Sequence, residues 1–218
     1  GLPAVNVSYG GAAHSGVYHS IYDSYTFYER FLDTGYVYGV TEAQTMATAV
    51  LRMADAPLLP FEFRAPARTY RKYADQLAHL AAENDTTATL DLAPLRAALV
   101  LLDSAAAAWD GASAGLSSTT RLDQRGPALT VVNRLLASAE QVLTDPGGLP
   151  RRPWFRHQIY APGAYTGYGV KTMPGIREAL EARHLDEAQG QTARVAAVLT
   201  AYAGRIQRAA VALAAALQ

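Results

Sequence analysis

Cysteine is absent from this 218-residue sequence. A disulfide framework and a cysteine-ligated zinc site are therefore both excluded. Net charge is missing as well, because 19 lysines and arginines balance 19 aspartates and glutamates. Without a net field to attract a polyanion, we expect neither nucleic acid nor an anionic membrane surface among the partners.

Long apolar runs are also lacking. No stretch approaches the roughly 18 apolar residues that a membrane span needs, so we expect no span in this chain. The first ten residues have neither the basic start nor the apolar middle of a signal peptide. Because the sequence opens directly on a strand-like segment, we expect it to be a piece of a longer protein.

The first 56 residues combine strand and helix patterns. Residues 4–9 alternate apolar and polar side chains before a glycine pair, which predicts a strand ending in a turn. Residues 38–54 carry apolar side chains at spacings of three and four, which predicts a helix. Pro57 and Pro60 end that pattern, so we place a domain boundary there and assign residues 1–56 to one domain.

The remaining residues, 57–218, are helical in character. Apolar side chains recur on one face of four segments, which are 68–82, 91–112, 127–143 and 188–217. Helices with one apolar face must bury it against one another. The pattern therefore predicts a mainly α fold, in which a four-helix-bundle-like domain follows a strand-loop-helix segment.

Residues 145–174 interrupt the helical pattern. They are rich in proline, glycine and aromatic side chains. A long irregular segment inside a compact domain is uncommon and is typically a functional loop. We therefore expect a loop that faces a ligand.

Two motifs carry a family resemblance that covers essentially the whole chain. The first runs from Gly1 to Asp23 and includes Gly16-Val17-Tyr18-His19-Ser20. The second runs from Asp145 to Pro162 and is followed by Pro174-Gly175-Ile176. Both resemble the C-terminal part of the glutamate carboxypeptidases, also called N-acetylated-alpha-linked acidic dipeptidases, and of their relative the transferrin receptor.

The resemblance implies an α/β exopeptidase with two zinc ions, of which residues 1–56 are the C-terminal edge. His19 matches the last zinc ligand of that family. A neutral imidazole on a loop is well suited to zinc, which activates water and polarises the scissile carbonyl. Tyr18 and Tyr168 match tyrosines whose hydroxyl groups bind the C-terminal carboxylate of a peptide substrate, through charge-assisted hydrogen bonds.

One departure from the family concerns substrate choice. Gly167 stands where the glutamate-releasing members have a lysine that pairs with the glutamate side chain. Lys171 lies four residues further on and is an alternative cation. A broader carboxypeptidase or dipeptidase is therefore as consistent with the sequence as an enzyme strict for C-terminal glutamate.

Two other side chains of the second motif, Arg156 and His157, are expected to be buried hydrogen-bonding groups that hold the loop. The remaining histidines have no neighbours that suggest a metal site.

The resemblance also implies a two-fold homodimer formed through residues 57–218. With one zinc ligand and no general base, the chain alone is expected to be inactive. The alternative is a dimerisation module of a catalytically dead, receptor-like homologue that acts in binding or assembly. Retention of Tyr18 and His19 favours the enzyme. Family members commonly act outside the cytosol, which favours an exported parent.

Overall fold

The computed structural model describes residues 1–9, 17–83, 90–114, 116 and 126–218. The chain divides into two compact units. One comprises Ala4–Ala56 and the other comprises Pro57–Gln218 together with Gly1–Pro3. Across the described residues, no helix combines the length and the apolar character that crossing a bilayer requires.

The smaller unit consists of short helical turns and one long helix. Helix α1 (Tyr25–Phe27) leads into the π-helix η1 (Tyr28–Leu32), and α2 follows at Val37–Ala54. The prediction of a helix over 38–54 is confirmed. Asp33 is the only buried residue among those described in this unit. The described residues of this unit therefore form no apolar core.

Asp33 organises the start of α2. Its carboxylate accepts hydrogen bonds from the backbone amides of Tyr38 at 3.0 Å and Gly39 at 2.8 Å. It also accepts the Tyr28 hydroxyl at 2.7 Å. Burial alone would raise the pKa of Asp33, but these hydrogen bonds lower it overall. Asp33 thus satisfies helix amides that have no partner within the helix.

The strand predicted over residues 4–9 is wrong. This segment is not in a strand and pairs with no other in the described parts of the chain. Strand pairing requires a neighbouring segment to accept and donate backbone hydrogen bonds. The alternating pattern was present, but the described residues supply no such neighbour.

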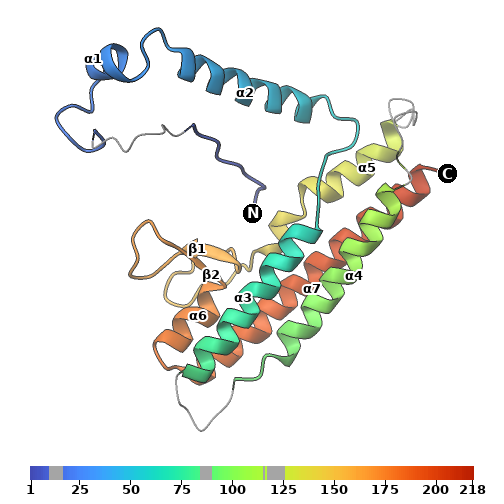
Figure 1. The fold of residues 1–218 in the computed structure, drawn as a ribbon. Coiled ribbons are helices and arrows are strands. Elements are labelled where there is room, and N and C mark those ends of the chain that lie inside the picture. The colour runs from blue at the N-terminus through green and yellow to red at the C-terminus, as the bar shows by residue number, and fades with distance from the viewer. Residues whose placement is uncertain (10–16, 84–89, 115, 117–125) are drawn as a thin grey trace. The chain divides into compact units, whose positions relative to one another are not determined.

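The larger unit is a bundle of long helices (Figure 1). Helices α3 (Arg64–Glu83), α4 (Ala93–Ser113) and α7 (Leu185–Ala216) lie side by side, and α5 (Gly126–Ala137) packs on α7. Their apolar faces form one core, with fully buried leucines at positions 77, 95, 102, 129, 136 and 199. Burial of each such side chain stabilises the fold by about 1.5–3 kcal/mol. The predicted mainly α fold is confirmed.

One predicted helix is shorter than expected. The segment 127–143 is helical only as far as Ala137, and a 3-10 helix, η3, follows at Glu140–Leu143. The backbone tightens because the Ala139 amide bonds to the carbonyl of Leu136, three residues back. Ala139 and Leu143 remain buried, so the apolar pattern continues across the change of helix type.

The segment predicted to be irregular over 145–174 contains a small hairpin. Strand β1 (Tyr160–Pro162) pairs antiparallel with β2 (Val170–Thr172), and Tyr160 lies opposite Thr172. Helix α6 (Pro174–Glu181) follows directly and packs on α7. Residues 163–169, which join the two strands, are called the hairpin tip below.

Candidate functional site

Tyr18 and His19 lie together in a tight turn of the smaller unit. The Ser20 amide donates to the Val17 carbonyl at 3.0 Å, and the Ser20 hydroxyl donates to the same oxygen at 2.7 Å. His19 has a φ of +62°. A non-glycine residue in this left-handed region is uncommon and often marks a functional position.

The two side chains of this turn touch each other. Their ring centroids are 4.0 Å apart with an interplanar angle of 63°. Both side chains are exposed, and 79% of Tyr18 is open to solvent. The turn therefore presents an imidazole and a phenol side by side.

The hairpin tip presents two more phenols in the larger unit. Tyr165 and Tyr168 are both fully exposed. Gly167, between them, has a φ of +59°, and a Cβ built there would meet nothing within 4 Å. The tip is closed by hydrogen bonds from the Gly163 amide and the Thr166 hydroxyl to the Gly169 carbonyl, at 3.0 and 2.7 Å.

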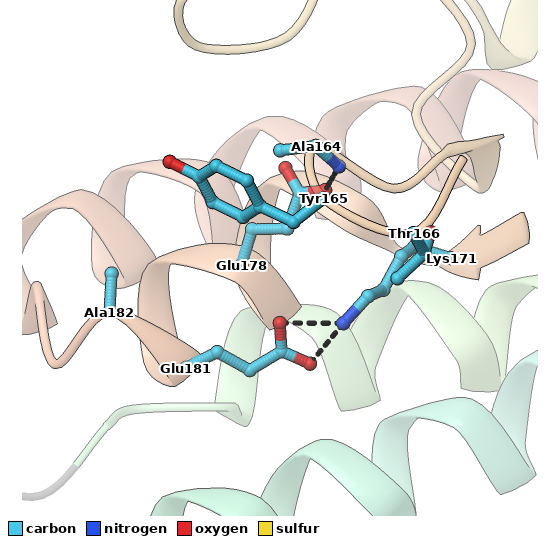
Figure 2. A pocket seen from close by; sticks show the side chains of 7 residues that line it. All are labelled: Ala164, Tyr165, Thr166, Lys171, Glu178, Glu181 and Ala182. Atoms are coloured by element: carbon cyan, nitrogen blue, oxygen red, sulfur yellow. Dashed lines mark hydrogen bonds and ion pairs between the residues drawn. The ribbon is translucent and has the colours of Figure 1, made fainter. Parts of the chain in front are cut away.

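Lys171 does not lie free beside the tip. Its ammonium donates to both carboxylate oxygens of Glu181 on α6, as Figure 2 shows. The pair lies in a pocket that Tyr165 and Glu178 also line. Lys171 was the alternative to a lysine at position 167 as a partner for a substrate side chain. A cation already paired in this way is poorly suited to that role.

Aromatic and histidine side chains support the base of the hairpin. The Tyr160 ring packs edge-on against Tyr70 and Tyr73 of α3, with centroids 6.3 and 5.9 Å away. The hydroxyl groups of Tyr73 and Tyr160 are 3.3 Å apart. Burial and this hydrogen bond raise the pKa of Tyr160, so the phenol stays neutral.

His157 holds the same region through both ring nitrogens. Nδ1 accepts from the amides of Ile159 and Tyr160, at 3.2 and 3.1 Å. Nε2 therefore carries the proton and donates to Glu140 at 2.9 Å. The predicted hydrogen-bonding role of His157 is confirmed, although the side chain is partly rather than fully buried. The same prediction for Arg156 is wrong, because its side chain is exposed.

A different arginine of the loop, Arg152, is well shielded from solvent and paired. It forms an ion pair with Glu178 of α6, with Nη2 2.5 Å from Oε2, and the two side chains are only 13% and 15% exposed. Sequence reasoning missed this pair because its members are 26 positions apart. The available signal was two adjacent arginines in a loop that precedes an amphipathic helix.

The described residues do not supply a complete set of side chains to ligate a metal ion. No group of three or more His, Cys, Asp or Glu side chains converges among these residues. The exposed imidazole of His19 suits one position in a zinc coordination shell. Tyr18 adjoins it, whereas Tyr168 belongs to the other unit.

Comparison with known proteins identifies a family for most of the bundle. Residues 90–207 match the family model of the transferrin receptor-like dimerisation domain. The matched region begins just before α4 and ends inside α7, so it includes the hairpin and the core helices α4, α5 and α7.

Curated relatives extend the similarity over more of the chain. A probable glutamate carboxypeptidase of Arabidopsis thaliana is 31% identical over 182 residues, which are 83% of this chain and 25% of the relative. A probable glutamate carboxypeptidase of Arthroderma benhamiae is 27% identical over 186 residues, covering 84% and 25%. The aminopeptidase NAALADL1 of Rattus norvegicus is 28% identical over 169 residues, covering 74% and 21%. The chain therefore spans about a quarter of the length of these relatives.

Proposed function

Because this chain belongs to the transferrin receptor-like dimerisation domain family, we propose that it is the C-terminal part of a dizinc exopeptidase. The observation that carries the proposal is similarity to three peptidases over 74–84% of the chain. In this proposal residues 57–218 are the dimerisation domain. Residues 1–56 are the edge of the catalytic domain, and the exposure of the apolar side chains described in this segment supports this.

His19 is the residue of this chain that would hold zinc. Its exposed ring, fixed in a left-handed turn, supports this role. When bound, zinc lowers the pKa of water and polarises the scissile carbonyl. One histidine binds zinc weakly, so we propose that the chain alone is inactive and that other parts of the intact protein complete the site.

Tyr18 and Tyr168 would bind the C-terminal carboxylate of a peptide. Each presents an exposed phenol that can donate to a carboxylate oxygen. Gly167 offers no side chain for a second carboxylate, and Lys171 is paired with Glu181. We therefore propose a carboxypeptidase or dipeptidase with a broad preference for the C-terminal residue.

The bundle would join two copies of the protein. A two-fold dimer uses the same surface of both copies. Light scattering after size exclusion, over a tenfold range of concentration, tests this for the chain itself. A stable species of twice the 23.3 kDa chain mass supports an autonomous dimerisation domain. A monomer at every concentration would show that the chain does not dimerise by itself.

The decisive experiment measures metal content and peptide hydrolysis in the intact protein. We expect two zinc ions per chain and cleavage of N-acetylated dipeptides. His19→Ala should lower the zinc content and reduce kcat/KM by more than about a hundredfold, because changes in the second shell alone cost 10–100-fold. His79→Ala, an exposed histidine on α3, is the control and should change neither.

Unchanged zinc and activity in His19→Ala would overturn the ligand assignment. An intact protein without zinc and without hydrolysis would instead favour the second candidate, a receptor-like dimer that acts in binding or assembly. The match to the transferrin receptor-like dimerisation domain is the observation that supports this second candidate.

A further inference from the structure

The ion pair Arg152–Glu178 joins the loop ahead of β1 to α6, beside the pair Lys171–Glu181 that joins β2 to the same helix. Glu178 lies on α6 and Arg152 lies ahead of the hairpin, in the loop that follows η3. Arg152 Nη2 is 2.5 Å from Glu178 Oε2, and its guanidinium also lies over the Phe155 ring. Because both side chains are largely shielded from water, the pair is held more tightly than a surface pair.

Arg152 also contacts the last residue of β1, and Glu178 contacts the start of the tip. Arg152 Nη1 donates to the Pro162 carbonyl at 2.6 Å. Glu178 Oε1 accepts from the Ala164 amide at 2.8 Å, a contact visible in Figure 2. The two residues that flank Gly163 are therefore both fixed to the same ion pair.

Backbone hydrogen bonds connect this part of the tip to the residue next to Tyr168. The Gly163 amide donates to the Gly169 carbonyl at 3.0 Å, and the Gly169 amide donates to Thr166 at 3.0 Å. Tyr168 immediately precedes Gly169. A displacement of residues 162–164 would therefore move the backbone that carries the Tyr168 phenol.

A neighbouring ion pair has similar chemistry but does not reach the tip. Arg151 binds Glu187 of α7 through two hydrogen bonds, at 2.8 and 2.7 Å. The hydrogen bond from Arg151 lowers the pKa of Glu187. The hydrogen bonds of Arg151 go to Glu187 and not to the tip. Arg151 has Coulombic interactions with Glu178 and Tyr165, so the Arg151–Glu187 pair is a control for the loss of hydrogen bonds to the hairpin.

We infer that Arg152 and Glu178 are positioning residues, which hold the hairpin tip so that Tyr168 meets the C-terminal carboxylate of a peptide substrate. This inference rests on the proposed function. In this inference neither residue contacts the substrate. Their effect is exerted through the backbone of the tip, where small displacements of a binding group are costly.

The test uses the intact protein with Arg152→Met, Glu178→Gln and the control Arg151→Met. Glu178→Gln keeps the shape and one acceptor, so it remains informative if Arg152→Met fails to fold. The first readout is hydrogen exchange of the amides in residues 163–169. The second is the separate measurement of kcat and KM on N-acetylated dipeptides with a free C-terminal carboxylate.

We expect exchange at Gly163 and Ala164 to rise at least about tenfold in Arg152→Met, because a charge-assisted contact is lost. KM should rise roughly tenfold while kcat changes less than about threefold, since the loss concerns binding of the carboxylate. Glu178→Gln should shift both readouts in the same direction by less. Arg151→Met should shift neither.

Two results would overturn the positioning role in an active enzyme. One is unchanged exchange in the tip of both variants. The other is faster exchange with an unchanged KM, which would mean that the pair holds the tip but the tip does not serve substrate. A wild-type protein that cleaves no dipeptide overturns the proposed function and the substrate part of this inference. The exchange readout then still decides whether the pair holds the tip.

Discussion

The ammonium of Lys171 donates to both carboxylate oxygens of Glu181, with 2.6 Å to Oε2. Lys171, the cation that the sequence offered in place of a lysine at position 167, is thus already paired with a carboxylate of α6. Four positions earlier, Gly167 leaves open space where a side chain would stand. In the proposed function, the lack of a side chain at Gly167 would therefore leave the tip without a cation for a substrate carboxylate.

Gly167→Lys is expected to create a preference for C-terminal glutamate. A Cβ meets no atom within 4 Å there, so the lysine fits, at a backbone cost of about 1–2 kcal/mol for the left-handed conformation. The new ammonium can pair with the substrate side chain. Relative kcat/KM for N-acetylated dipeptides ending in glutamate and in leucine measures the change. Gly167→Met is the uncharged control, and an equal ratio in both variants would contradict the prediction.

Tyr168→Phe should weaken substrate binding in the intact protein. Loss of a hydrogen bond to a charged group costs about 1.5–3 kcal/mol, which corresponds to a rise in KM of roughly tenfold or more. Tyr18→Phe should behave alike. Tyr165→Phe removes the same hydroxyl from an equally exposed position of the tip and should leave KM unchanged. If KM rose for Tyr165→Phe and not for Tyr168→Phe, Tyr165 would be the tyrosine that binds the carboxylate, and the prediction would be wrong.

Gly148→Ala should destabilise the protein more than Gly167→Ala. Both glycines have a φ near +60°, but a Cβ at Gly148 would lie 2.2 Å from the Pro153 carbonyl oxygen. We expect roughly 2–4 kcal/mol for Gly148→Ala, from left-handed strain and overpacking together, against about 1–2 kcal/mol for Gly167→Ala, where only the strain applies. Thermal unfolding of both variants measures the difference. Equal losses of stability in the two variants would contradict the prediction, because they would show that the backbone at Pro153 moves away from the new methyl group at no energetic cost.

Alkaline conditions should destabilise the bundle through its buried tyrosines. Burial raises the pKa of Tyr70 and Tyr202 above the unfolded value of about 10. Their contribution to stability is therefore complete below pH 10 and is lost as the pH rises towards the folded pKa, because the unfolded chain releases the protons first. The double variant Tyr70→Phe, Tyr202→Phe should lose less stability between pH 9 and 11. Denaturant unfolding measures it, and an unchanged pH slope would contradict the assignment.

The helices of the bundle were predictable because each one carries a continuous apolar face. Segments 91–112 and 188–217 were placed within a few residues of α4 and α7. The end of α5 was not predictable, since Ala139 and Leu143 keep the helical spacing although the backbone tightens to a 3-10 helix. Apolar spacing reports which face is buried and is insensitive to such a change.

The site was predictable only in part. The aromatic and glycine content of 145–174 indicated a functional loop, and His157 was correctly expected to hold it. The sequence predicted a buried Arg156, whereas Arg152 forms the partly buried ion pair. Three arginines within six positions are equivalent in sequence, and only the position of Glu178 on α6 distinguishes them.

The sequence by itself determined the helical class, the absence of disulfides and the residue types available for chemistry. These follow from local periodicity and composition, which are readable without a partner segment. Only the tertiary structure decided that residues 4–9 form no strand, that Lys171 is paired with Glu181 and that Arg152 is paired with Glu178. Each of these depends on contacts between residues distant in sequence, and such contacts exist only once the helices have packed.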